Sequence, residues 1–398
     1  MIAPDLKKVI PFFQPIISTA DRGVYAYEVL AREERDGRIY SLGPYFEDPA
    51  VSDLDKLTLD LHVRKLAFET YAASGSKGKL FINLKPSWIY MHREHYDKLP
   101  TLAMLDQYAI DPQNIVIEVT EEELIGDYGI FGKLLTEYRK AGCMLAIDDF
   151  GRGASNVERI AHIMPDIIKL DRSIVQKTDT HHSFYEICSA MSAFGAVSGF
   201  NLLFEGVETA SQLERCIKTG WCYLQGYVFS PAKPGFETEY ANGKLLTDIL
   251  YIQNAREGWN IRRRSEVCTT MESEMERLRP LIPLEEETLR EPAALHGLAK
   301  ELPYYCVRCF VCNDEGKLLS HIYQMEGHAV VVITNDKPGT GIFWELFTQA
   351  LDALHGERLG HLSSIYKNVA TKEHVMTYTH KLRQDRLLCV DIMSTVLY

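Results

Sequence analysis

Two adjacent carboxylates, Asp148 and Asp149, directly follow a short apolar run at 144–147, and a glycine-rich loop at 150–155 comes next. Carboxylates at the end of an apolar strand add little to core packing, but their hard oxygen atoms suit divalent cations. An aspartate is also a good helix N-cap, which would explain one of these residues. It does not explain a pair that precedes a glycine-rich loop, so the pattern predicts a site that binds divalent cations.

A second charged strand end follows in the chain. The apolar run 167–168 ends in Lys169 and Asp171, and a helical stretch and Pro165 separate it from the first run. This order predicts two parallel strands joined by a helix. The carboxyl ends of parallel strands lie at the same edge of a sheet, where α/β proteins build their sites. We therefore expect the two charged ends to share one site.

Polar residues also interrupt other apolar strand candidates. Glu28 lies within one of them, where a buried carboxylate is costly unless it is paired or bound to a metal; the alternative is a surface pair with Arg32. Asn83, near the end of another, needs hydrogen-bond partners or a cation, or else caps the next loop. The acids at 121–123 would stand at the start of a helix, where the helix dipole favours them. Glu118 precedes that helix, so the dipole does not explain it.

Eight strand candidates carry these residues, and the later ones alternate with helices. The alternation predicts an α/β fold, a TIM-type (β/α)8 barrel with its functional residues at the mouth formed by the carboxyl ends of the strands. A turn at 21–23 joins the first two candidates into a hairpin, so one barrel strand should be antiparallel, and 39–56 should form a loop. The strands are expected at 9–17, 24–30, 80–84, 115–119, 144–147, 167–168, 201–204 and 223–225, with helices at 57–73, 100–108, 128–141, 185–199 and 212–220.

Five motifs stand at these strand ends. They are YEVLAR around Glu28, E-x-T-E from Glu118 to Glu121, DDFG from Asp148 to Gly151, EGVET from Glu205 to Thr209, and QGYVFS from Gln225 to Ser230. The set resembles the motifs of EAL domains, the phosphodiesterases that cleave cyclic di-GMP, and the resemblance spans residues 9–236. Val29 stands where the family signature has alanine.

Two positions in the loop after the aspartates depart from the family's pattern. Arg152 stands where the family has a small or hydroxyl residue, and Ala154 stands where it has an aromatic one. The family's loop contacts the dimer partner and the metal site, so these changes bear on regulation more than on chemistry. A solvated loop residue is the commoner interpretation of Arg152.

The resemblance implies a role for each matched residue. Two ions, Mg²⁺ or Mn²⁺, would bind, the first through Glu28, Asn83, Glu118 and Asp148, and the second through Asp148, Asp149 and Glu205. The catalytic residues would be Glu205 as general base, Lys169 beside the attacking water or the phosphoryl oxygens, and Asp149. The substrate would contact Gln14, Leu30, Arg32, Asp171, Glu208 and Gln225, while Glu121, Phe150 and Gly151 would order the loop at the dimer interface.

The reaction implied by the resemblance is hydrolysis of cyclic di-GMP to linear pGpG in bacterial signalling. A receptor or scaffold that binds cyclic di-GMP without turnover is the alternative. No residue of the implied set is missing, which favours an enzyme. The combination of EVLAR and EGVET disfavours a different barrel metallophosphohydrolase.

The remaining chain predicts a connecting helix over 237–283 and a smaller α+β domain over 284–398, after a barrel over 1–236. The order of elements resembles the PAS-like C-terminal domains of some EAL proteins of Gram-positive bacteria, the YkuI type, which implies a regulatory domain that binds an unknown small ligand. Cys306 and Cys309 should face opposite sides of a strand, so core packing is preferred to a metal site with Cys312. Strands are expected at 304–311, 317–323, 327–333, 361–366, 374–382 and 387–393, and a helix at 341–354.

Composition limits the partners of the 398-residue chain. A net charge of −12 argues against a nucleic-acid polymer, although an anionic nucleotide could bind through metal ions and local cations. The absence of a long apolar run argues against a membrane span, and the N-terminus lacks an apolar signal core, so we expect a cytoplasmic protein. Nine scattered cysteines fit reduced thiols. By the resemblance, the partners are cyclic di-GMP and a second copy of the chain in a homodimer.

Overall fold

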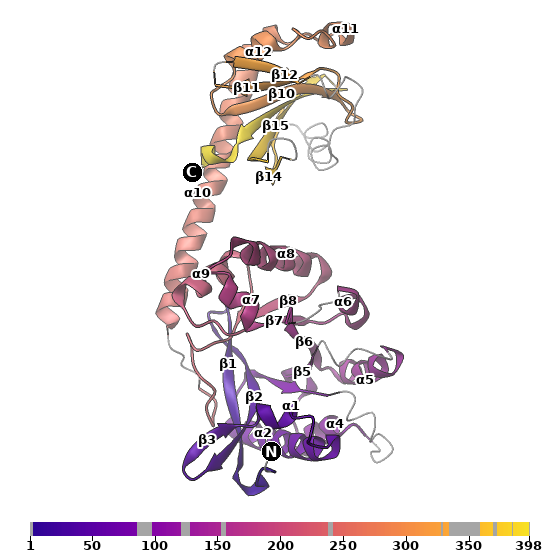
Figure 1. The fold of residues 1–398 in the computed structure, drawn as a ribbon, viewed down its shortest axis with the longest axis vertical. Helices are drawn as coiled ribbons and strands as arrows, with labels where there is room; N and C mark the ends of the chain where they lie inside the picture. The colour runs from indigo at the N-terminus through magenta and orange to yellow at the C-terminus, as the bar shows by residue number, and fades with distance from the viewer. Residues whose placement is uncertain are drawn as a thin grey trace. The chain divides into compact units, whose positions relative to one another are not determined.

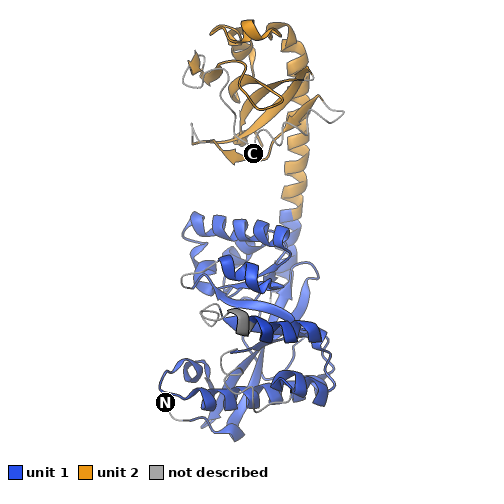
Figure 2. Cartoon of the chain, turned by 90° about the vertical axis from the view of Figure 1, so that its right-hand side faces the viewer, with its two compact units in different colours: residues 1–253 blue, residues 254–398 orange. Residues whose placement is uncertain are grey.

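A computed structural model describes residues 3–85, 98–120, 128–152, 157–237, 242–327, 329–333, 359–368, 372–383 and 385–397. The chain forms two compact units, residues 1–253 and 254–398 (Figure 2). Each unit has its own hydrophobic core. The three-part division at 236 and 283 remains a prediction.

Unit 1 is a closed barrel of eight strands (Figure 1). The sheet order is β1-β9-β8-β7-β6-β5-β4-β2, and pairing of β1 with β2 closes it. Strand β1 is antiparallel to both of its neighbours, whereas the other pairs within the barrel are parallel, so the predicted barrel with one antiparallel strand is confirmed. The strands are β1 (Val9–Ser18), β2 (Gly23–Arg35), β4 (Lys79–Asn83), β5 (Ile115–Thr120), β6 (Met144–Phe150), β7 (Ile167–Leu170), β8 (Asn201–Phe204) and β9 (Tyr223–Leu224).

Helices follow most of these strands. They are α1 (Gly43–Glu47), α2 (Asp53–Ser74), α4 (Pro100–Gln107), α5 (Tyr128–Ala141), α6 (Val157–Ile163), α7 (Arg172–Lys177), α8 (His182–Ser198) and α9 (Ala210–Lys218), with short 3-10 turns at Leu6–Lys8 and Pro112–Asn114. Their apolar faces and the outward faces of the strands form the larger core of unit 1. This core holds the barrel strands in place from the outside.

The prediction of a loop over 39–56 is wrong. The segment contains part of strand β3 (Arg38–Ser41), all of α1, and the first residues of α2. Asp36 and Gly37 both have positive φ and form a two-residue turn between β2 and β3, an arrangement that Asp-Gly favours. Ser52 caps α2 by accepting a hydrogen bond from the Asp55 amide, so the helix begins earlier than the apolar spacing suggests.

One residue from each barrel strand fills the centre of the barrel. The eight are Ile16, Ala26, Phe81, Val116, Ala146, Ile167, Leu203 and Tyr223. They are packed together and almost fully buried. Because side chains alternate along a strand, the residue two positions further on must also face the interior. This layer therefore fixes which residues line the mouth above it.

Helix α10 (Gly243–Leu278) begins in unit 1 and ends in unit 2, which is built on an antiparallel sheet. The sheet order is β12-β11-β10-β16-β15-β13, and β14 also pairs with β15. The sheet, α12 and the last turns of α10 enclose the main core of unit 2. Its strands are β10 (Cys306–Asn313), β11 (Ile322–Glu326), β12 (Ala329–Ile333), β13 (Gly360–Leu362), β14 (Tyr366–Lys367), β15 (His374–Arg383) and β16 (Arg386–Met393), and its helices include α11 (Glu286–Leu289) and α12 (His296–Glu301).

Several predictions for unit 2 need correction. The second strand begins at Ile322, not at 317, and the strand expected at 361–366 is two short strands. Cys306 and Cys309 do not face opposite sides. The β10–β16 pairing is irregular between Cys306 and Arg308, which shifts the alternation and places both thiols in the main core. All nine cysteines are free thiols. The helix expected at 341–354 lies outside the described residues.

Candidate active site

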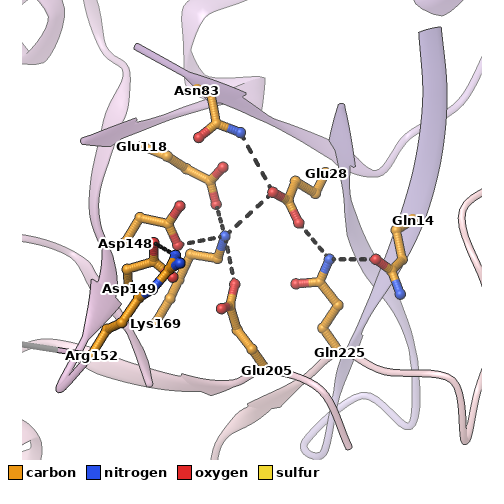
Figure 3. Close-up of polar contacts among 10 residues, drawn as sticks. All are labelled: Gln14, Glu28, Asn83, Glu118, Asp148, Asp149, Arg152, Lys169, Glu205 and Gln225. Carbon is orange, nitrogen blue, oxygen red and sulfur yellow. Dashed lines mark hydrogen bonds and ion pairs between the residues drawn. The ribbon is translucent and has the colours of Figure 1, made fainter. Parts of the chain in front are cut away.

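A layer of polar side chains lies directly above the apolar centre of the barrel. Each member is two positions from a residue of the apolar layer, on the side of the carboxyl-end mouth. In the parallel strands it follows the apolar residue, whereas in the antiparallel strand β1 it comes two positions before it. The eight are Gln14, Glu28, Asn83, Glu118, Asp148, Lys169, Glu205 and Gln225. Figure 3 shows their side chains converging on one space. The strand geometry thus gathers residues that are far apart in the sequence.

Lys169 is at the centre of this layer, with a side chain that is 1% exposed. Its Nζ atom lies 2.6 Å from Glu118 Oε1, 2.7 Å from Glu205 Oε1 and 2.9 Å from Asp148 Oδ1. Glu28 Oε1 is further away, at 3.5 Å. One ammonium group is therefore shared by four carboxylates (Figure 3).

The donor set fits divalent cations. Both carboxylate oxygens of Glu118 and the Oδ1 atom of Asp148 are buried without a hydrogen-bond partner in the described chain, although Lys169 contacts two of these three atoms. One oxygen from each of Asp148, Asp149 and Glu205 lies within 4.8 Å of the other two. Buried carboxylates need compensating charge, and carboxylate and amide oxygens are the ligands that Mg²⁺ and Mn²⁺ prefer.

Burial and charge shift the pKa of several groups in the layer. Burial raises the pKa of Glu118 well above its ordinary value, and it raises the pKa of Glu205 to about 8, against the opposing effect of Lys169. Burial alone would lower the pKa of Lys169, but the surrounding carboxylates, Asp148 first, raise it well above its ordinary value. Lys169 therefore keeps its charge.

Hydrogen bonds hold Glu28 from two sides. Its Oε2 atom accepts a hydrogen bond of 2.6 Å from Gln225 Nε2, and its Oε1 atom accepts a longer one of 3.5 Å from Asn83 Nδ2. Gln225 also donates to Gln14 Oε1 at 3.3 Å, and Gln14 donates to the Ser230 carbonyl at 3.3 Å. These contacts link β1, β2, β4 and the end of β9 around one carboxylate.

Asp149 lies at the exposed side of the carboxylates. Its φ of 54° places it in the left-handed region, after an irregularity in the β6–β7 pairing. Arg152 Nη1 lies 3.0 Å from Asp149 Oδ2. Burial, followed by the neighbouring Asp148, raises the pKa of Asp149. Gly151 has a φ of 94°, and a Cβ atom there would lie 2.1 Å from Ile174 Cδ1, so the turn requires glycine.

Two adjoining cavities open from the polar layer. One has a volume of about 730 Å³, and its lining includes Gln14, Glu28, Leu30, Asp148, Asp149, Arg152, Asp171, Arg172, Glu205, Glu208, Gln225 and Tyr227. The other has a volume of about 350 Å³, and its lining includes Leu30, Arg32, Ser41, Asp60, Asn83, Lys85, Asp148 and Asp149. The aspartate pair thus borders both cavities, which is the position expected of groups that act on a substrate occupying them.

The structure brings most of the expected site residues together. Arg32 reaches the smaller cavity, where its guanidinium donates to the Ala31 carbonyl at 2.9 Å. Asp171 caps α7 through the Ser173 amide, and Glu208 lies 3.6 Å from Arg172. Phe150 is buried in the core, and Glu121 lies outside the described residues.

Three residues that line the larger cavity, Arg152, Arg172 and Tyr227, are not among the predicted site residues. Arg152 is 61% exposed, in keeping with its interpretation as a solvated loop residue, and its guanidinium also pairs with Asp149. Arg172 directly follows the predicted Lys-x-Asp motif, and Tyr227 lies within the QGYVFS motif, but neither is predicted to contact the substrate. Residues adjacent to a strand-end motif could have been included for that reason.

Two family models match the chain. A model of the EAL domain matches residues 2–232, and a model of an EAL-domain associated signalling protein domain matches residues 253–398. YkuI of Bacillus subtilis, an uncharacterized EAL-domain containing protein, is 25% identical over 404 residues, which cover 100% of this chain and 97% of YkuI. RocR of Pseudomonas aeruginosa, a cyclic di-GMP phosphodiesterase, is 31% identical over 227 residues, 56% of this chain and 57% of RocR.

Solved structures agree with these matches. The crystal structure of Bacillus subtilis YkuI in complex with substrate c-di-GMP and calcium has a TM-score of 0.84 and covers 98% of both chains. At 23% identity, this likeness supports the fold. The manganese and cyclic di-GMP complex of Klebsiella pneumoniae BlrP1 has a TM-score of 0.52 at 28% identity, and it covers 59% of this chain and 58% of BlrP1.

Proposed function

Because the chain belongs to the EAL-domain family, we propose that it hydrolyses cyclic di-GMP to linear pGpG with two divalent cations, Mg²⁺ or Mn²⁺. The observation that supports this most strongly is the polar layer, in which four carboxylates contact Lys169 at one mouth of the barrel. The relative RocR is a cyclic di-GMP phosphodiesterase, and YkuI and BlrP1 bind the same nucleotide in crystals.

The cation ligands would be oxygen atoms of the polar layer. Glu28, Asn83, Glu118 and Asp148 would hold one ion, and Asp148, Asp149 and Glu205 would hold the other. Ions bound there supply Lewis acidity and neutralise phosphoryl charge. Calcium in the YkuI complex and manganese in the BlrP1 complex are both hard cations that suit such ligands.

The chain's own groups would move the proton and hold the substrate. Glu205 would accept a proton from the attacking water as the new oxygen–phosphorus bond forms. The P–O3′ bond breaks, and the leaving 3′ oxygen takes up a proton from solvent water, which produces a 5′-phosphate and a free 3′-hydroxyl. Lys169, whose Nζ atom lies 2.7 Å from Glu205 Oε1, would orient that carboxylate and stabilise negative charge on the phosphoryl oxygens.

The two cavities would hold the nucleotide. Arg32 would pair with a phosphate from the wall of the smaller cavity. The larger cavity would be shaped by the other substrate-binding residues that we propose, Gln14, Leu30, Asp171, Glu208 and Gln225. A substrate across both cavities would place its phosphodiester over Asp148 and Asp149, which border each of them.

Turnover by the full-length protein tests the proposal. Cyclic di-GMP would be incubated with Mg²⁺, Mn²⁺ or EDTA, and products would be separated by chromatography. We expect pGpG in either metal and none in EDTA. Tight binding of cyclic di-GMP without product in either metal would contradict the enzyme and support a receptor or scaffold.

Regulation is a further part of the proposal. We propose a cytoplasmic homodimer in which the loop from Phe150 and Gly151, together with Glu121, is ordered at the dimer interface. We also propose that the PAS-like domain over 284–398 binds a small ligand, in keeping with the match of 253–398 to a signalling domain. No nucleic-acid polymer or membrane partner is proposed. Among the described residues, no helix is long and apolar enough to span a bilayer. Light scattering of the full-length protein would test the dimer.

A further inference from the structure

We propose that Arg152 is an exchangeable counter-ion of Asp149, which pairs with this carboxylate when no metal is bound and competes with a divalent cation for it. The inference rests on the metal site of the proposed function. It concerns the outer carboxylate of that site and predicts that Arg152 lowers the affinity of the site for metal.

The geometry of the turn brings the two groups together. The Arg152 amide donates a hydrogen bond of 3.1 Å to the Asp149 carbonyl, and the guanidinium Nη1 atom lies 3.0 Å from Asp149 Oδ2. An oxygen of the same carboxylate lies within 4.8 Å of Asp148 and Glu205 oxygens. Arg152 therefore pairs with a group that would ligate the cation.

The two cations of the site differ in how easily they can leave. Lys169 is 1% exposed and contacts four carboxylates, so its displacement would uncover several buried charges. The Arg152 side chain is 61% exposed and makes one carboxylate contact within ion-pair distance among the described residues. Such exposed pairs contribute little free energy, so a divalent ion can replace the guanidinium at low cost.

The charge balance also favours exchange. Five carboxylates, those of Glu28, Glu118, Asp148, Asp149 and Glu205, face the cations of Lys169 and Arg152 (Figure 3). The carboxylates therefore outnumber the two cations, so that oxygen ligands remain available to a divalent ion.

Arg172 offers a matched control. Its side chain is also 61% exposed and lines the same cavity, but it lies 3.6 Å from Glu208 instead of the ligand carboxylates. Arg172→Gln removes the same formal charge from the same cavity wall. It therefore separates a specific contact with Asp149 from a general change in the charge of the cavity.

The experiment is a titration of the full-length protein with Mn²⁺ at fixed ionic strength and without nucleotide, followed by the electron paramagnetic resonance signal of free Mn²⁺. We expect Arg152→Gln to bind the weaker Mn²⁺ ion about two- to fivefold more tightly than wild type, the range of an exposed ion pair. Arg152→Lys should lie between them, and Arg172→Gln should stay within about twofold of wild type.

The outcomes separate this inference from the proposed function. Equal Mn²⁺ affinity of wild type and Arg152→Gln would overturn the inference, as would equal tightening by Arg172→Gln. Wild-type protein that binds no Mn²⁺ would instead overturn the metal site of the proposed function. In an Asp149→Asn background the inference requires Arg152→Gln to have no further effect, because the carboxylate for which the two cations compete is gone.

Discussion

Lys169 has an environment in which an ammonium group keeps its charge only because of its neighbours. Burial disfavours a charged lysine, but four carboxylates lie within 3.5 Å of its Nζ atom. The dependence is mutual, because those carboxylates also need a buried cation. Lys169 is thus a structural element of the polar layer as well as a candidate catalytic group.

Replacement of Lys169 by methionine should destabilise the protein most when no metal is present. We expect the free energy of unfolding in EDTA to fall by about 3–5 kcal/mol, since one partner of a buried ionic cluster is lost. Mn²⁺ should restore part of this loss by neutralising the same carboxylates. Urea denaturation with EDTA or Mn²⁺ measures both effects, with Lys218→Met on the surface of α9 as the control. Equal losses in the two conditions would contradict the argument.

Glu205→Gln should abolish turnover and spare nucleotide binding. The amide keeps the size of the side chain but cannot accept the proton of the attacking water, and loss of a general base typically costs about 10²–10⁴-fold in rate. Product formation and cyclic di-GMP binding would be measured in parallel, with Glu214→Gln, which pairs with Lys218 on α9, as the control. Wild-type turnover by Glu205→Gln would rule out its role as base.

Much of the polar layer can be derived from strand periodicity. A residue two positions beyond an inward apolar residue also faces the interior, which places Glu28, Asn83 and Glu118 together once the barrel is assumed. Periodicity does not reveal the Arg152–Asp149 pair. That contact depends on the left-handed conformation of Asp149, which cannot be predicted from the two residue types.

At the scale of elements, turn and cap residues decide the boundaries at β3 and at the start of α2, where the predictions are wrong. Strands with apolar runs, such as those predicted at 80–84 and 115–119, agree with β4 and β5 to within about a residue. The apolar pattern does not predict β3, because its residues are exposed and carry no apolar alternation. Its signal was the Asp36–Gly37 turn, and Ser52 was likewise the signal for the start of α2.

A buried network joins three helices to the end of β4. Arg64 on α2 lies in an ion pair with Asp60, donates a hydrogen bond of 2.7 Å to Thr101 Oγ1 on α4, and donates one of 3.0 Å to the Asn83 carbonyl. Tyr138 on α5 donates to the same Thr101 hydroxyl. The network therefore fixes the backbone of a candidate metal ligand.

Arg64→Met should destabilise unit 1 by about 3–5 kcal/mol, because Asp60 and the Asn83 carbonyl lose a buried partner. Urea denaturation followed by circular dichroism measures the loss. Thr101→Val is the comparison, since it removes one hydroxyl but no charge and should cost about 1–3 kcal/mol. A smaller loss for Arg64→Met than for Thr101→Val would contradict the importance of the ion pair.

At the scale of the whole molecule, the two units respond to different conditions. In unit 2, burial and then the nearby Arg279 lower the pKa of His380 on β15, while Glu276 opposes the shift. Below its ordinary pKa of 6.5, the unfolded chain therefore binds more protons than the folded one. The stability that depends on neutral His380 is present above about pH 6.5 and is lost as the pH falls through the lower pKa of the folded state.

His380→Gln should flatten this dependence, because glutamine does not titrate. The measurement is the calorimetric melting temperature of unit 2 between about pH 8 and pH 5 in wild type and variant. Wild type should lose more stability than the variant toward low pH. Parallel curves for the two proteins would show that His380 does not control the response.

Because each unit has its own core, we expect the two units to melt in separate transitions. Metal should raise the melting temperature of only one of these transitions. Unit 1 contains the carboxylate layer. The described residues of unit 2 contain no group of acidic side chains close enough together to hold a cation. Mn²⁺ at about 100 times its Kd should stabilise unit 1 by about 2.7 kcal/mol and raise its melting temperature by about 5–10 °C. The transition that shifts with pH through His380 identifies unit 2 in the same calorimetric traces. Asp149→Asn should reduce the Mn²⁺ shift of the other transition, and a shift of both transitions together would contradict the independence of the two cores.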